Sequence, residues 1–291
     1  MSSFSFSVNP HLVLRKTAME RLKYRIRRFQ HTLGMAPAGW AGGFGGVKGY
    51  LSADTDTSDL GLTGQALADV KRESENYIVK YTKDLEAIPV DQLKHTVQFQ
   101  ILPIVEELIN RGLTHNRIAD VGCCYVRINK TLIDKHPNVV WDMVDFPDSL
   151  HEINAGVLSP NMNLIADYPL DWLKATSTNY DAVLFNRTLA AMPVSEFRRY
   201  LRILKTRTSY VVFNEPGKIL FLDNDLDIDS IDPACPLRMS IWNTHNYRKV
   251  FEEEGYEFVH YDAVRTTHHF SAPQHFVIQG IARPIGSSAS I

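Results

Sequence analysis

Four polar side chains, each placed near the end of a short apolar run, are the residues of this sequence best suited to bind a ligand. They are Asp120, Asp145, Asp167 and Asn186. A carboxylate can accept two hydrogen bonds from a pair of neighbouring hydroxyl groups, in a charge-assisted arrangement that no neutral side chain equals. A single aspartate of this kind more often caps a helix. Four such residues in succession predict a site for a ligand with vicinal hydroxyls.

The segment IADVGCCYVRINKTL, residues 118–132, begins as a strand and continues as a loop of the phosphate- or nucleoside-binding type. Glycine in such a loop permits positive φ and lets the backbone approach a ligand. Gly122 is present, but Cys124 and Val126 stand where further glycines are expected. Cys124 is small, whereas the β-branched Val126 resists a strained backbone. The sequence leaves open whether the loop keeps its ligand.

Two side chains are candidates for a general base, which removes a proton from a reacting hydroxyl. His245 stands at the start of a predicted helix, and Glu215 ends the fifth predicted strand. Each has a simpler alternative, because His245 could cap its helix and Glu215 could pair with an arginine. Both alternatives remain open at this point.

No metal site is predicted. Residues 222–232 contain five aspartates but lack the glycine and glutamate spacing of a calcium loop. A solvated acidic loop is the preferred interpretation, because like charges packed together normally stay in water. The adjacent His268 and His269 would point to opposite faces of a strand, and His275 follows later. The three cysteines form no zinc-type pair, so we expect reduced thiols.

The elements that must position these residues alternate between strands and helices. Strands are predicted at 117–122, 139–146, 163–167, 181–186, 209–216, 256–264 and 275–283, and helices at 91–112, 128–135, 194–204 and 245–255. This alternation predicts an α/β fold with a mostly parallel, Rossmann-like sheet and helices on both faces. The last two strands are joined by too short a segment for a crossover helix, so they should run antiparallel.

Seven strands with a reversed last strand resemble the class I S-adenosylmethionine-dependent methyltransferases, over residues 95–283. DVGCCYVR is similar to the family's Asp-x-Gly-x-Gly-x-Gly loop, and WNTHNYRKVFEEEGYEFV resembles a late segment of sugar and small-molecule O-methyltransferases. The resemblance implies S-adenosylmethionine (SAM) as cofactor and a hydroxyl of a small molecule, such as a sugar or natural-product intermediate, as acceptor. The segment NRTL, 186–189, lacks the Asn-Pro-Pro-Tyr type clamp of methyltransferases acting on nucleic-acid bases, which favours a small-molecule acceptor over nucleic acid.

The resemblance also implies residue roles. Asp145 would bind both ribose hydroxyls, Asp167 the adenine amino group, and Asn186 would line the methyl-transfer site. The full set of implied cofactor-binding residues is Asp120, Gly122, Cys124, Asp145, Phe146, Asp167 and Asn186. Nicotinamide dehydrogenases are the rival enzyme class, but this sequence lacks their Gly-x-Gly-x-x-Gly motif. The stronger alternative is a non-catalytic methyltransferase-like subunit that binds a partner protein, since it would explain the altered loop.

The chain divides near residue 90 into a helical N-terminal extension, 1–90, and a methyltransferase-like domain, 91–291. Residues 11–30 form a predicted basic amphipathic helix, for which docking on the domain or on a second copy in a homodimer is preferred to an anionic partner. Residues 35–51 contain six glycines and form a predicted connector.

The formal charge of −2 indicates no global preference for nucleic acid or membranes. With no secretory signal or spanning segment, a cytoplasmic location is expected.

Overall fold

The computed structural model describes residues 79–80, 82–89, 97–145, 154–217, 237–239, 242–266 and 275–286, together with Gln65, Arg72 and Asn76. Its strands are β1 (Arg117–Val121), β2 (Val140–Asp145), β3 (Met162–Ala166), β4 (Tyr180–Asn186), β5 (Thr208–Gly217), β6 (Leu237–Met239), β7 (Trp242–Thr244), β8 (Tyr256–Thr266) and β9 (His275–Pro284). Its helices after residue 96 are η4 (Val97–Ile101), α4 (Leu102–Asn110), α5 (Arg127–Lys135), α7 (Pro169–Ala175), η5 (Leu189–Ala191), α8 (Val194–Leu204) and α9 (Tyr247–Glu253).

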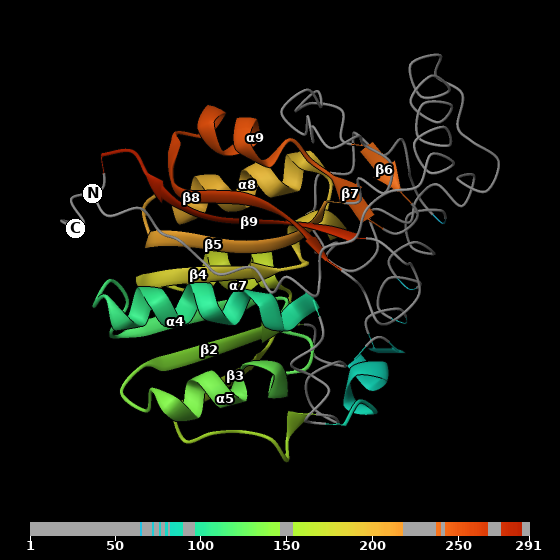
Figure 1. The fold of residues 1–291 in the computed structure, drawn as a ribbon, viewed down its shortest axis with the longest axis vertical. Helices are drawn as coiled ribbons and strands as arrows, with labels where there is room; N and C mark the ends of the chain where they lie inside the picture. The colour runs from blue at the N-terminus through green and yellow to red at the C-terminus, as the bar shows by residue number, and fades with distance from the viewer. Residues whose placement is uncertain are drawn as a thin grey trace.

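Seven strands form one sheet in the order β3-β2-β1-β4-β5-β9-β8 (Figure 1). The pairings among β3, β2, β1, β4 and β5 are parallel, whereas β9 runs antiparallel to both β5 and β8. The predicted Rossmann-like fold and the reversed last strand are confirmed. The order reverses between β1 and β4, and open α/β sheets bind ligands at such a switch point, outside the carboxyl ends of their strands.

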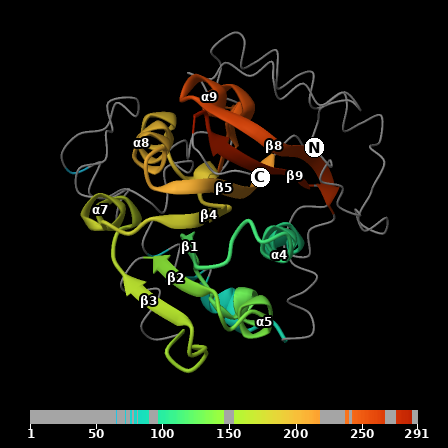
Figure 2. The same cartoon turned by 90° about the vertical axis from the view of Figure 1, so that its left-hand side faces the viewer.

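Helices cover both faces of the sheet (Figure 2). One core cluster contains buried residues of η4, α4 and α5, and the other contains buried residues of α7, α8 and α9. The central strands are therefore apolar on both sides, which is why they appear in the sequence as continuous rather than alternating apolar runs. In β4, Ala182 and Leu184 face the first cluster while Val183 and Phe185 face the second.

The structure departs from the predicted elements in several places, including α7 and η5, for which no ranges were predicted. The helix predicted to run from 91 to 112 is, in its described part, a 3-10 helix followed by α4, with Pro103 in the first turn of α4. Its predicted end at Gly112 is confirmed by a φ of 69°. The two-stranded ribbon β6–β7 was not predicted, because its strands are only three residues each.

Several predicted features lie outside the described residues. These are the basic helix at 11–30, the glycine-rich connector at 35–51, Phe146, the acidic stretch at 222–232, and the adjacent His268 and His269. Part of the predicted extension is described: residues 82–86 are helical, and Leu85, 2% exposed, belongs to the core cluster on the α8 face. Within the described part of the chain, no helix is both long and apolar enough to cross a membrane.

Candidate functional site

The loop after β1 has positive φ angles of the kind that glycine favours, although only one of its expected glycines, Gly122, is present. Gly122 has a φ of 77° and Cys124 a φ of 54°, so a cysteine occupies the left-handed region that normally favours glycine. Val126 has ordinary helical angles, φ −63° and ψ −18°, at the start of α5. Its side chain is fully buried in the cluster of α4 and α5. The backbone strain therefore falls on Cys124 and not on the β-branched residue.

Two buried polar side chains hold this loop. The Cys124 amide donates to Asp145 Oδ2 at 2.6 Å. Asn154 bridges the next turn, because its Nδ2 donates to the Cys124 carbonyl at 2.8 Å and its Oδ1 accepts from the Val126 amide at 3.1 Å. Both Asp145 and Asn154 are 0% exposed. A left-handed cysteine persists only where its surroundings fix it, and these three bonds do so.

The loop amides are used within the protein. The Gly122 and Cys123 amides both donate to the Val144 carbonyl, at 2.8 and 3.2 Å. With the Cys124 and Val126 amides also occupied, four of the loop's backbone donors, those at residues 122, 123, 124 and 126, point at protein acceptors. A phosphate-binding loop works by aiming such donors at the anion. This loop is therefore poorly suited to a diphosphate, which argues against a dinucleotide.

Asp120 lies beneath the loop, on the α5 face of the sheet. It is 2% exposed, and its Oδ2 accepts a hydrogen bond from Asn129 Nδ2. Burial, with a further contribution from the nearby charge of Asp145, raises the pKa of Asp120 to about 7. Among the described residues, neither Asp120 Oδ1 nor Asn129 Oδ1 has a hydrogen-bond partner. A protonated carboxyl can donate to an amide oxygen, so a proton on Asp120 suits this pair.

Asp167 and Asn186 stand at the carboxyl ends of β3 and β4, two strands that β2 and β1 separate in the sheet. Asp167 follows β3; its amide donates to the Asp145 carbonyl at 3.0 Å, and its half-buried carboxylate accepts from the Tyr168 amide at 2.8 Å. Asn186 ends β4 and donates to the Gln98 carbonyl of η4 at 2.9 Å, while accepting from Asn214 of β5 at 2.9 Å. The carboxylate of Asp167 is thus the more accessible of the predicted acidic groups.

The carboxylate of Glu215 binds the backbone of the turn that follows β4. Glu215 is 0% exposed, and its oxygens accept from the amides of Thr188, Leu189 and Ala190 at 2.9, 2.9 and 3.0 Å. Burial raises the pKa of Glu215 to about 8, although these three N–H donors act in the opposite direction. Both oxygens are therefore occupied in positioning the turn.

His245 fixes the other side of the same turn. Its side chain is 1% exposed, and Nε2 lies 3.1 Å from the Leu189 carbonyl. Burial lowers the pKa of His245 to about 4, so the ring is neutral at pH 7. With Nε2 carrying the proton for Leu189, Nδ1 bears a lone pair that meets no partner among the described residues.

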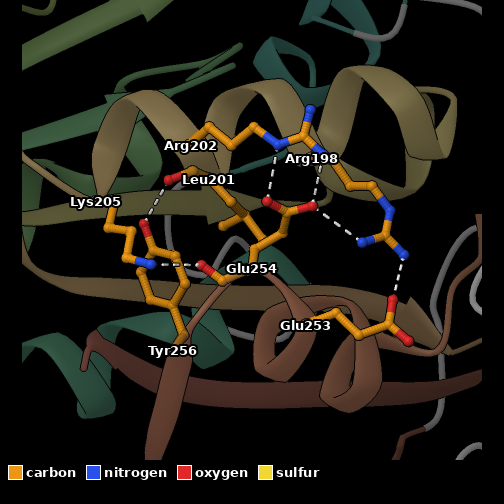
Figure 3. Close-up of polar contacts among 7 residues, drawn as sticks. All are labelled: Arg198, Leu201, Arg202, Lys205, Glu253, Glu254 and Tyr256. Carbon is orange, nitrogen blue, oxygen red and sulfur yellow. Dashed lines mark hydrogen bonds and ion pairs between the residues drawn. The ribbon is translucent and has the colours of Figure 1, made fainter.

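An ion cluster on the surface joins α8 to the end of α9 (Figure 3). Arg198 donates to Glu253 at 2.6 Å and to Glu254 at 3.0 Å, and Arg202 makes two hydrogen bonds of 2.9 Å to Glu254. Exposed pairs of this kind contribute modestly. Their geometric effect is to hold α9 against α8, and His245 lies two residues before α9 begins.

The structure brings four of the predicted residues together: Gly122 and Cys124 lie in the loop after β1, Asp145 accepts a hydrogen bond from this loop, and Asp120 lies beneath it. It places His245 and Glu215 on opposite sides of the turn after β4. Sequence reasoning missed Asn154, Arg187 and Thr82. Asn154 belongs to no recognisable sequence motif, and Thr82 lies in the predicted N-terminal extension. Arg187 was missed because a left-handed backbone, here with a φ of 65°, cannot be predicted for an arginine from the sequence. No three His, Cys, Asp or Glu residues in the described ranges form a metal-binding group.

No family model and no curated protein matches the sequence. Solved structures do match. Human N-acetylserotonin methyltransferase, crystallised with SAM, has 12% identity and a TM-score of 0.49, over 78% of this chain and 61% of its own. A SAM-dependent methyltransferase from Leishmania major has 14% identity and a TM-score of 0.45, over 70% and 82%. Magnesium protoporphyrin IX methyltransferase from Synechocystis with bound SAM has 12% identity and a TM-score of 0.42, over 63% and 78%. The likeness is one of fold.

Proposed function

We propose that the chain is a SAM-dependent methyltransferase that acts on a hydroxyl group of a small molecule. The observation that carries this proposal is the loop at the switch point, where Cys124 keeps a left-handed φ of 54° while the loop amides bond within the protein. A ligand can approach the backbone of such a loop closely, but the loop amides are not available to bind a phosphate. This combination suits a nucleoside that carries no phosphate, and SAM contains such a nucleoside.

The residues at the carboxyl edge fit this group. Asp145 at the end of β2 would face the ribose, and the half-buried Asp167 after β3 would face the adenine. Cys124, small and 8% exposed, would lie against the nucleoside where glycine usually does. When bound, the cofactor would supply an electrophilic methyl group on a sulfonium. The protein's own contribution would be to align the acceptor hydroxyl and take its proton.

We assign the proton-accepting role to His245 and a positioning role to Glu215. His245 is neutral and has a lone pair on Nδ1, whereas Glu215 already accepts three backbone hydrogen bonds. If His245 accepts the proton, His245→Ala will lower turnover and remove the acid limb of its pH profile. An unchanged profile would exclude His245. Glu215→Gln should instead reduce stability, because an amide group places its NH2 against a backbone N–H.

Calorimetric titration with S-adenosylhomocysteine (SAH), the demethylated product of SAM, tests the proposal. We expect binding by the wild type and at least tenfold weaker binding by Asp167→Ala. Asp171→Ala is the matched control, since this carboxylate lies on α7 and its ion pair with Lys174 is long, at 3.9 Å. Equal losses in both variants would show a general charge effect.

The alternative is a non-catalytic subunit that binds a partner protein. It is favoured by the hydrogen bonds of two buried carboxylates, because Asp145 accepts from the backbone of the loop after β1 and Glu215 accepts from the backbone of the turn after β4. A wild type that gives no heat with SAM or SAH while remaining folded would support this alternative and reject the methyltransferase proposal.

A further inference from the structure

His245 and Tyr247 each carry one polar atom without a partner, and their rings are in contact. The ring centroids lie 5.6 Å apart, with an angle of 77° between the ring planes. The two residues are 1% and 0% exposed. His245 Nδ1 and the Tyr247 hydroxyl both lack a hydrogen-bond partner among the described residues. Buried polar atoms are almost always paired, so two exceptions on touching rings indicate a functional role.

The two atoms are of opposite hydrogen-bonding type. His245 Nε2 lies 3.1 Å from the Leu189 carbonyl, which can only accept, so the ring proton is on Nε2. Nδ1 of the neutral ring is therefore an acceptor, whereas the Tyr247 hydroxyl is a donor. A hydroxyl group between them donates to Nδ1 and accepts from Tyr247. One hydroxyl thus satisfies both atoms.

The surroundings of this pair are aromatic. Phe197 lies 5.4 Å from the His245 ring and 6.1 Å from the Tyr247 ring. Phe213 stacks on Tyr247, with ring centroids 5.7 Å apart. Both phenylalanines are 0% exposed, and their side chains offer no hydrogen bond to a second hydroxyl. A vicinal hydroxyl would therefore lose its bonds to water without replacement, which lowers affinity.

We propose that Tyr247 and His245 bind the reacting hydroxyl of the acceptor between them, and that the acceptor carries this hydroxyl alone on an apolar skeleton. This inference rests on the proposed function and deepens it, because it adds an acceptor-binding residue and narrows the substrate class. The hydroxyl's proton passes to His245 Nδ1, while Tyr247 keeps its own proton and donates to the oxygen throughout. Both residues are buried, so a hydroxyl reaches them only when a neighbouring segment moves.

Nuclear magnetic resonance of protein labelled in its histidine ring nitrogens measures this entry directly. Phenol is the probe with one hydroxyl, and catechol is the probe with a vicinal pair. Phenol should shift the Nδ1 resonance of His245, which is identified by its absence in His245→Ala. Catechol should bind at least about fivefold more weakly, because one buried hydroxyl is left unpaired. Tyr247→Phe removes the donor alone and should weaken phenol binding about 2- to 10-fold.

Tyr200→Phe is the matched control. The Tyr200 hydroxyl is also buried and also lacks a partner among the described residues, but its ring contacts Phe185, which carries no acceptor. Tyr200→Phe should leave the phenol affinity unchanged. If Tyr247→Phe does not fold, the comparison of phenol with catechol in the wild type still decides.

Three results would overturn the inference: an Nδ1 resonance that phenol does not shift, catechol binding as tight as that of phenol, or equal losses in Tyr247→Phe and Tyr200→Phe. Calorimetry with SAH on the same wild-type protein separates this inference from the proposed function. A wild type that binds SAH but gives one of these three results keeps the proposed function and loses only the inference. A wild type that binds no SAH rejects both.

Discussion

Thr82 Oγ1 lies 3.0 Å from Cys124 Sγ, although 42 positions separate the two residues. The contact places part of the predicted N-terminal extension directly on the loop after β1. Leu85, one helical turn further along, is buried in the core cluster that also contains Cys124. Thr82 and Leu85 therefore pack as part of the core, whatever role the residues before them have. The boundary near residue 90 stays a prediction.

Leu85→Ala should destabilise the whole domain. A buried leucine truncated to alanine costs about 2–5 kcal/mol, and Leu85 is only 2% exposed. Leu158→Ala is the matched control because Leu158 is 42% exposed. Urea unfolding followed by circular dichroism measures both variants. Similar small losses would show that the segment around Leu85 contributes little to the core.

Cys124→Gly should be tolerated better than Cys123→Gly. Both cysteines are buried, at 8% and 6% exposure, so each change removes a similar side chain. Only Cys124 has positive φ, and glycine there relieves a strain of about 1–2 kcal/mol. We expect the free energy of unfolding of Cys124→Gly to exceed that of Cys123→Gly by less than this amount, because Cys124→Gly also removes the contact between Cys124 Sγ and Thr82 Oγ1. If Cys124→Gly and Cys123→Gly had identical urea unfolding midpoints and slopes, the backbone strain assigned to Cys124 would be contradicted.

Most of the fold could be predicted, because long apolar runs and their alternation with helical patterns determine a parallel sheet. The site was harder. The sequence indicated that residue 124 needs unusual backbone freedom, but not that Asp145 and Asn154 would hold a cysteine there. Val126 was expected to resist strain, yet it begins α5 in an ordinary conformation. The side-chain partners of Asp120 and Glu215 depend on packing between distant elements, which no local pattern encodes.

Asn154→Ala should loosen the loop as well as lower stability. It leaves the Cys124 carbonyl and the Val126 amide without their partner, at a cost of about 1–3 kcal/mol for each buried group. We expect lower stability and weaker SAH binding by calorimetry. Asn161→Ala removes an amide that likewise bonds backbone carbonyls, among them that of Val139 at 2.8 Å, but away from the site. Asn161→Ala should destabilise the protein while leaving its affinity for SAH unchanged. If Asn161→Ala lowered the SAH affinity as much as Asn154→Ala does, Asn154 would have no specific role in the loop.

Asp120 should make stability depend on pH. Its pKa is raised from 3.8 to about 7, so the folded state holds the proton more tightly than the unfolded state. The stabilisation is complete below pH 4 and is lost as the pH rises through 7, by about 1.4 kcal/mol for each pH unit crossed between the two pKa values. Asp120→Asn replaces the protonated carboxyl with a group that does not titrate and can still bond Asn129.

Unfolding in urea at pH 5, 6, 7 and 8 measures this effect. Wild type and Asp120→Asn share every other titrating group, so the difference between their curves reports the Asp120 carboxyl together with its interaction with Asp145. Wild-type stability should fall relative to the variant as the pH rises. Parallel curves would mean that Asp120 is ionised throughout.

A crystal structure of the wild type with SAH tests the central claim most directly. The account predicts the adenine beside Asp167 and the ribose beside Asp145, with the edge of the ribose against Cys124. A crystal that diffracts well but shows no ligand density along the tips of β3, β2, β1 and β4, or a nucleoside bound elsewhere, would contradict it.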